Sequence, residues 1–368
     1  MPKSALRQAA SERFVLLDAS RGLAALAVLF WHYQHFFYPI GDFSPIAGFS
    51  ESAPLGWLVG PLYRYGELAV PFFWIISGFV FATVYAGTRT TTRQFAVNRL
   101  ARLYPLHLLT LCIVALLQAG AQHRYGTSLI YGDNSLANFL KHVAFASNWT
   151  GYDYSFNAPI WSVSAEILIY GLFWMTRDWL WKRGILLPIA AMAGFGGLHL
   201  LAPGLPLLPC GFFFFTGVCV HFCFVALRGR LLLTLLSSLL LLGFGWSVQA
   251  SGLDSLGHAC LFAGAILAIC RAEPLLSRRW HGPLSVVGDN TYGMYLWHIP
   301  VQLALFLALS PLVEMADIAR SPWFLLAYLL IVCVIARVSY LRFEKPMRDI
   351  VRRWGGAGAA KMAAVSAP

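Results

Sequence analysis

The sequence has few charged residues. Asp, Glu, Lys and Arg together make up only 12% of its 368 residues, whereas hydrophobic residues make up 58%. An ordinary soluble domain carries about 25% charged residues. So few polar side chains could not cover the surface of a soluble protein of this length. The composition therefore excludes that class and indicates a membrane protein.

Metal-binding and nucleotide-binding motifs are also missing. The seven cysteines lie within or at the edges of apolar runs, and none has the C-x-x-C spacing that is typical of a metal site. We interpret them as small apolar packing residues and expect neither a disulfide framework nor a metal. The sequence likewise has no Walker loop, Rossmann glycine pattern, HExxH motif or nucleophile elbow.

Long apolar runs dominate what is present. A transmembrane helix needs about 20 mostly apolar residues, and the runs predict an all-α, polytopic membrane bundle of about ten such helices. We expect residues 1–354 to form one membrane domain and residues 355–368 to be a disordered tail. The predicted spans are residues 14–37, 68–87, 101–121, 158–177, 185–202, 207–227, 231–250, 255–271, 290–310 and 322–342.

The distribution of basic residues predicts the topology. The sequence has 27 Lys and Arg residues against 16 Asp and Glu residues, a net charge of +11. All but four of the basic residues fall near the two termini and on alternate connections; the exceptions are Arg64, Arg124, Lys141 and Arg320. The positive-inside rule then places both termini in the cytoplasm. The positive charge therefore needs no nucleic-acid partner.

The first predicted span, LDASRGLAALAVLFWH, carries ionisable groups that a bilayer penalises. Arg21 and His32 are eleven residues apart, which is about three helical turns, so they share a face. Asp18 precedes Arg21 by three residues and can pair with it. This spacing favours a functional pair. A snorkelling arginine and a hydrogen-bonded packing histidine would give the same pattern.

The fourth predicted span carries a polar stripe. Ser162, Glu166 and Tyr170 recur at every fourth position and lie on one face. By helical rise, Glu166 should lie at the depth of His32, where it could orient the imidazole and stabilise its protonated form. A structural glutamate bonded to a Ser or Tyr of a neighbouring span is the alternative.

The ninth predicted span has a further polar face, formed by Thr291, Tyr295, His298 and Gln302. We expect His298 nearer the cytoplasmic side, and the pattern fits a structural role as well as a catalytic one. At the cytoplasmic edge of the third span, Arg99 and Arg102 are three residues apart and suit phosphate or acidic lipid head groups. Topology alone would also explain them.

These segments together resemble the acyltransferase-3 family of integral membrane O-acyltransferases, over almost the whole chain from Leu17 to Arg348. Members of this family use acyl-CoA to modify bacterial surface glycans, lipid-linked sugars and some antibiotics. The residues that carry the resemblance are Arg21 and His32; Phe72, Phe73, Ser77, Gly78 and Phe79; Arg99, Arg102 and Pro105; Trp161, Ser162 and Glu166; Tyr295 and His298; and Glu344 and Pro346.

The resemblance implies transfer of an acyl group, acetyl by default, from cytoplasmic acyl-CoA to a hydroxyl of a glycan, lipid-linked sugar or other extracytoplasmic acceptor. His32 would be the general base and Glu166 would orient it, while Arg21, Arg99 and Arg102 would bind the phosphates of the donor. Transfer through an acyl-histidine is equally compatible with the sequence. The candidate acceptor-binding residues are Ser162, Trp161, Tyr295, His298, Trp149 and Tyr152.

Two other functions are compatible with buried ionisable residues. A proton-coupled transporter of a small polar solute would also keep His, Glu and Arg within its spans. It would more often have helix-breaking Gly or Pro pairs at corresponding positions of two halves, which this sequence lacks. A non-catalytic assembly subunit would leave the Arg21–His32 spacing unexplained. Release of free CoA in the presence of an acceptor separates the enzyme from both.

Overall fold

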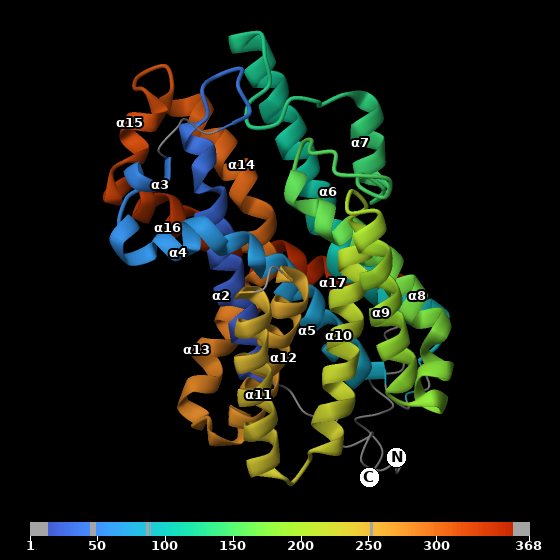
Figure 1. The fold of residues 1–368 in the computed structure, drawn as a ribbon. Helices are drawn as coiled ribbons and strands as arrows, with labels where there is room; N and C mark the ends of the chain where they lie inside the picture. The colour runs from blue at the N-terminus through green and yellow to red at the C-terminus, as the bar shows by residue number, and fades with distance from the viewer. Residues whose placement is uncertain (1–13, 45–48, 86–87, 89, 251–252, 356–368) are drawn as a thin grey trace.

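The computed structural model describes residues 14–44, 49–85, 88, 90–250 and 253–355. Every regular element assigned within these residues is helical, and Figure 1 shows them as a bundle. The predicted all-α, polytopic fold class is confirmed. The predicted tail lies outside the described residues, apart from Gly355.

Nine helical segments of the described chain are long and apolar enough to cross a membrane. They are Val15–Phe37, Gly56–Tyr85, Thr92–Tyr125, Ala158–Arg183, Leu207–Ala226, Leu231–Gln249, Asp254–Leu275, Thr291–Leu309 and Pro322–Trp354. The remaining predicted span corresponds to α9 (Leu186–Leu201), whose 16 residues are fewer than the about 20 that a span needs. The described residues thus hold nine candidate spans and one shorter apolar helix, in agreement with the predicted multi-pass membrane protein of about ten apolar helices.

Helices from both halves of the chain surround the candidate site. They are α2 (Val15–His32), α5 (Ala69–Tyr85), α6 (Thr92–Tyr125), α8 (Trp161–Arg183), α13 (Arg278–Asp289), α14 (Thr291–Leu309), α16 (Pro322–Ser339), the π-helical turn η5 (Tyr340–Glu344) and α17 (Lys345–Trp354). The other helices are α3 (Phe49–Ser52), α4 (Gly56–Tyr65), α7 (Leu136–Val143), α10 (Leu207–Ala226), α11 (Leu231–Ala250), α12 (Asp254–Ala272) and α15 (Met315–Ala319), with short 3-10 turns at Tyr33–Phe37, Gly66–Leu68, Ala158–Ile160 and Glu273–Leu275.

Helix α6 begins well before the predicted start at residue 101. A capping box fixes its first turn: the Gln94 amide donates to the Thr91 hydroxyl at 3.2 Å, and the Thr91 amide donates to the Gln94 side chain at 3.0 Å. Its end is set by Gly126, whose φ of 72° lies in the left-handed region. Hydropathy missed the first turns because they are polar and basic.

The two long connections that the predicted topology places outside the cytoplasm, residues 38–67 and 122–157, also contain helices. Residues 38–67 include α3 and α4, and residues 122–157 include α7. These helices are short, and their polar positions interrupt the apolar run that hydropathy detects. The predicted loops are therefore partly helical.

Close helix contacts at glycines fix the positions of the site helices. A Cβ atom on Gly78 of α5 would overlap the Phe214 carbonyl of α10. On the other side of the bundle, a Cβ on Gly288 would meet Asp18 of α2 at 2.7 Å. Small residues allow membrane helices to approach this closely. The second contact places the end of α13 beside the Asp18–Arg21 turn of α2.

Candidate functional site

A cavity of about 350 Å³ lies among α2, α5, α6, α8, α14 and α17. It brings together residues that the sequence analysis selected from four separate segments. They are Arg21, Arg99, Arg102, Ser162, Glu166 and Tyr295. The same cavity is lined by Arg348, which belongs to the C-terminal helix, and by the acids Asp18 and Asp289.

The arginines of the cavity are held by charge and by aromatic rings. A guanidinium nitrogen of Arg21 lies 3.7 Å from a carboxylate oxygen of Asp18, which confirms the predicted pair. The Arg99 guanidinium lies 4.9 Å from the centroid of the Phe81 ring, a cation–π distance. Its Nε is buried without a hydrogen-bond partner among the described residues. Such guanidiniums are suited to binding phosphate oxygens.

The polar stripe of α8 distinguishes the two ends of the cavity. Ser162, Glu166 and Tyr170 all line it, as predicted, and they cover about 12 Å of helical rise. Glu166 interacts with Ser77 and Tyr170, and Tyr170 lies within electrostatic range of Arg99. The arginines therefore lie near the Tyr170 end of the stripe, and Ser162 marks the other end.

Tyr295 connects the Ser162 end of the cavity to the histidines. Its hydroxyl lies 2.7 Å from the Ser162 hydroxyl and donates to the Pro159 carbonyl at 2.7 Å. Its ring centroid lies 6.2 Å from that of His298. A group that reached Ser162 from the arginine end would thus arrive beside the histidine side chains.

Three imidazole rings form a histidine cluster, composed of His32, His35 and His298. The centroid of His32 lies 4.8 Å from that of His298 and 5.1 Å from that of His35. His32 Nδ1 lies 3.0 Å from the Val28 carbonyl oxygen. Because a carbonyl can only accept, this nitrogen carries the hydrogen, and in the neutral ring Nε2 holds the lone pair. His32 Nε2 has no hydrogen-bond partner among the described residues.

Gln302 sets the orientation of the second histidine. Its amide nitrogen donates to the His32 carbonyl at 2.8 Å, so its amide oxygen faces His35 Nδ1 at 2.9 Å. His35 Nδ1 must then be the donor, which leaves Nε2 to accept from the Tyr131 hydroxyl at 3.4 Å. The histidine cluster is thus hydrogen-bonded to a residue of the 122–157 segment.

Two predictions about these residues are wrong. Glu166 does not orient His32: the His32 ring bonds its own helix at Val28, whereas Glu166 lies against Ser77 and Tyr170. Helical depth predicts position along the membrane normal but not which face of the helix meets which neighbour. His298 also lies level with His32 rather than nearer the cytoplasm, since the centroids of the two rings are only 4.8 Å apart.

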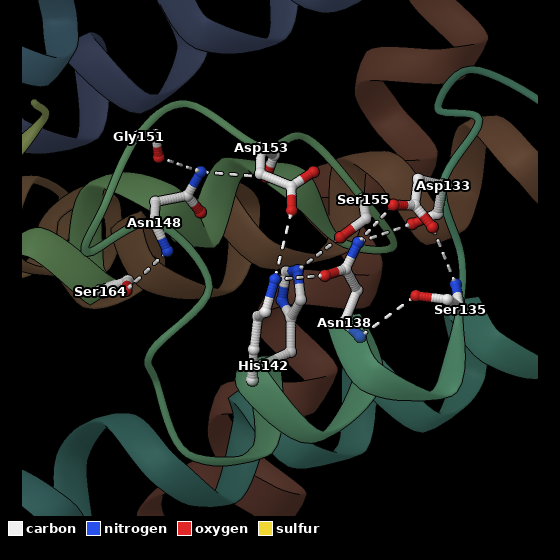
Figure 2. A network of polar contacts seen from close by, with 10 residues as sticks. Asp133, Ser135, Asn138, His142, Asn148, Gly151, Asp153, Ser155 and Ser164 are labelled. Atoms are coloured by element: carbon white, nitrogen blue, oxygen red, sulfur yellow. Dashed lines mark hydrogen bonds and ion pairs between the residues drawn. The ribbon is translucent and has the colours of Figure 1, made fainter. Parts of the chain in front are cut away.

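The segment between α7 and α8 is tied to α8 by its own polar groups. The Asn148 side-chain amide donates to the Asp153 carbonyl at 2.9 Å, and its backbone amide donates to the Ser164 hydroxyl at 3.4 Å (Figure 2). The Trp149 indole donates to the Ser164 carbonyl at 3.1 Å. These bonds fix the segment over the Ser162 end of α8.

His142 of α7 makes a second contact that holds this segment in place. Its Nε2 lies 3.1 Å from the Ser155 hydroxyl, as Figure 2 shows. Burial lowers the pKa of His142 from 6.5 to about 3, with further lowering by His107 and by the Lys141 charge. His142 is therefore neutral near pH 7, where it can accept a hydrogen bond.

The predicted aromatic acceptor residues do not line the cavity. Trp149 is 40% exposed and Tyr152 41% exposed. The Tyr152 ring packs edge-on against Trp161 at 5.2 Å, and Trp161 packs against Trp74 at 5.6 Å. Trp74 does line the cavity. The aromatic residues thus extend from the cavity wall to the exposed surface.

Several cavity residues were not predicted from the sequence. Arg348 was not among the predicted site residues, although the resemblance extends to it and includes the neighbouring Glu344 and Pro346. Tyr292 and Asp289 flank the start of α14 and line the cavity, but they were not among the predicted site residues. The signal for Arg348 was its place in a short helix with four basic residues, which is more charge than topology needs.

Comparison with known proteins identifies the family. Residues 14–340 match the family described as an acyltransferase domain, Acyl_transf_3. The chain belongs to the acyltransferase-3 family. The part that matches the acyltransferase-3 family includes every cavity residue named above except Arg348.

Two curated relatives match parts of this acyltransferase-3 chain. A Rhizobium radiobacter protein named "Protein 2 in picA locus" is 35% identical over 115 residues, which is 30% of this chain and 48% of that protein. A putative peptidoglycan O-acetyltransferase of Bacillus subtilis (strain 168) is 34% identical over 90 residues, which is 23% of this chain and 13% of that protein. The chain thus spans less than half the length of either relative. No solved structure matches it.

Proposed function

We propose that the protein is an O-acyltransferase of the bacterial inner membrane. It moves an acyl group, acetyl in the simplest case, from cytoplasmic acyl-CoA to a hydroxyl of a glycan or another extracytoplasmic acceptor. Family membership and the similarity to the putative peptidoglycan O-acetyltransferase of Bacillus subtilis support the reaction class. The observation that carries the proposal is one cavity with arginines at one end and Ser162 and Tyr295, beside the histidine cluster, at the other.

The donor enters at the arginine end. Arg21, Arg99 and Arg102 bind its phosphates, because guanidiniums form charge-assisted hydrogen bonds with phosphate oxygens. The pantetheine arm then follows the α8 stripe past Glu166 and places the thioester near Ser162. This direction agrees with both termini lying in the cytoplasm, since α17 and the first turns of α6 lie at the arginine end.

His32 Nε2 is the general base of the proposed reaction. It takes the proton of the acceptor hydroxyl as the oxygen attacks the thioester carbonyl carbon. The carbon–sulfur bond breaks, and the imidazolium returns the proton to the leaving thiolate, so the products are the acyl ester and free CoA. His35 and His298 pack against the ring and hold its orientation.

The acceptor approaches from the outer segment. Trp149, Tyr152 and Trp161 supply flat aromatic faces of the kind on which sugar rings stack, and Tyr131 connects this segment to His35. Glycan acceptors therefore suit the exposed aromatic side chains better than small apolar molecules do.

The proposal is tested by incubating the purified protein with acetyl-CoA and a surface-glycan fraction. Release of free thiol should depend on the acceptor and should equal the acetyl ester formed on the glycan. A transporter would release no thiol. Thiol release that does not depend on any acceptor, with no ester on the glycan, would contradict the proposed transfer.

A further inference from the structure

Five arginine side chains form a connected set in which each lies within electrostatic range of at least one other, and four of them line the cavity. They are Arg21, Arg99, Arg102, Arg348 and Arg352. Like charges held this close repel one another, and this repulsion opposes folding. A cluster of like charges of this kind is more typical of a site that binds an anion than of a part of the protein that only supports the fold.

Three of these arginines have buried donors that the protein does not satisfy. The Nε atoms of Arg99, Arg348 and Arg352 have no hydrogen-bond partner among the described residues. Leaving a buried donor unpaired costs about 1–3 kcal/mol, and more for a charged group. Oxygen atoms of a bound anion would remove this cost.

Carboxylates hold the arginines in place without pairing every donor. Glu344 lies within electrostatic range of Arg102 and Arg348, and the Ser339 hydroxyl donates to Glu344 at 3.4 Å. Glu344, Arg102, Arg348 and Asp289 line a smaller pocket that shares residues with the main cavity. The anion site therefore extends from the cavity toward α17.

The fold of the C-terminal segment brings α17 to this place. The π-helical turn η5 leads into α17, and π-turns are frequent at functional sites. The end of α17 packs on the start of α6, where a Cβ on Gly355 would meet Val97 at 2.5 Å. Arg348 and Arg352 are four residues apart and share a face of α17, whereas Arg353 is exposed.

We propose that α17 is part of the donor site and that Arg348 and Arg352 bind a second phosphate group of the donor. The diphosphate of CoA lies nearer the thioester and binds to Arg99, Arg102 and Arg21. The ribose 3′-phosphate lies at the far end of CoA and binds to the arginines of α17. The site thus selects a CoA thioester over a donor with a single phosphodiester, such as a carrier protein. The identity of this donor rests on the proposed function.

The test measures equilibrium binding of CoA and of 3′-dephospho-CoA to the purified full chain. Arg348→Gln should weaken CoA binding about tenfold or more, the loss of one charge-assisted contact, and should leave dephospho-CoA binding within about twofold. The matched control is Arg353→Gln, because Arg353 lies on the same helix but is exposed and outside the cavity. It should bind both molecules as the native chain does.

Thermal unfolding without added ligand separates a binding role from a structural one. Arg348→Gln should unfold at the same temperature as the native chain or higher, because it removes repulsion. If Arg348→Gln does not fold, Arg348→Lys keeps the charge and should weaken CoA selectively by a smaller factor, since lysine lacks the planar fork. Equal weakening of CoA and dephospho-CoA, or no weakening in either Arg348 variant, would overturn the inference.

The proposed function can fail separately from this inference. If the native chain does not bind CoA, the assignment of CoA as the donor is wrong. Binding of inorganic diphosphate then tests the arginines directly. Diphosphate binding that Arg348→Gln reduces and Arg353→Gln does not would keep α17 in an anion site. No diphosphate binding, or binding that Arg348→Gln leaves unchanged, would remove α17 from it.

Discussion

The imidazole centroids of His32 and His298 lie 4.8 Å apart, although the rings belong to α2 and α14. Each ring has its Nδ1 directed at the carbonyl four residues earlier in its own helix, at 3.0 Å for His32 and 3.4 Å for His298. Both Nε2 atoms therefore point away from their own backbones. His32 rather than His298 is the base in our account, because His32 is partly accessible and His298 is fully buried.

Replacement of Glu166 by glutamine should not abolish turnover. Glutamine keeps the shape of the side chain and its contacts with Ser77 and Tyr170, and it removes a negative charge near Arg21 and Arg99. We expect kcat to stay within about tenfold and KM for acyl-CoA to fall, because the arginines then attract phosphate more strongly. Steady-state kinetics over a range of acyl-CoA concentrations checks this.

The opposite kinetic result would restore the role that the sequence suggested for Glu166. A fall in kcat of about a hundredfold or more, with KM for the donor unchanged, would mean that this carboxylate supports the base in the transition state.

Replacement of Gln302 by leucine should destabilise the protein. It leaves the His32 carbonyl and His35 Nδ1 without their partner in a buried place, which costs about 1–3 kcal/mol for each group. Thermal unfolding in detergent should show a lower midpoint and turnover should fall as well. Gln122→Leu is the control, since Gln122 is exposed on α6. If both variants unfold alike, Gln302 does not organise the histidine cluster.

His142 predicts a loss of stability in acid. Its pKa is about 3 in the folded chain against 6.5 for the ordinary group, so the unfolded chain binds more protons at low pH. The stability that neutral His142 contributes is present above pH 6.5 and falls as the pH drops toward 3. Between pH 7 and pH 5 the loss is on the order of 1–2 kcal/mol.

Unfolding measured at several pH values, for the native chain and for His142→Gln, checks this expectation. The variant should lose less stability between pH 7 and pH 5 than the native chain does. His281→Gln, at an exposed position, should follow the native chain. Parallel pH curves for the native chain and His142→Gln would show that His142 does not stabilise the segment between α7 and α8.

Periodicity predicted the parts of the site that lie on one helix. The Asp18–Arg21 pair and the Ser162–Glu166–Tyr170 stripe follow from helical geometry, and both occur in the structure. Family resemblance added that these segments act together. Apolar runs predicted the membrane helices: nine correspond to candidate spans of the described residues, and the tenth corresponds to the shorter apolar helix α9.

Contacts between helices could not be predicted in this way. Helical periodicity does not define how α2 and α8 are rotated relative to each other. Glu166 was therefore paired with His32 from their equal depth alone. The His32 ring instead packs against His298 of α14, with 4.8 Å between the two ring centroids. Arg348 was missed for a related reason, since only the packing of α17 on α6 brings it to the cavity.

The rate of acceptor-dependent CoA release by His32→Gln tests the central claim most directly. We predict a loss of at least about a hundredfold, with CoA binding unchanged and with the exposed His123→Gln as active as the native chain. A folded, CoA-binding His32→Gln protein that turns over at the native rate would show that His32 is not the base, and would contradict the account.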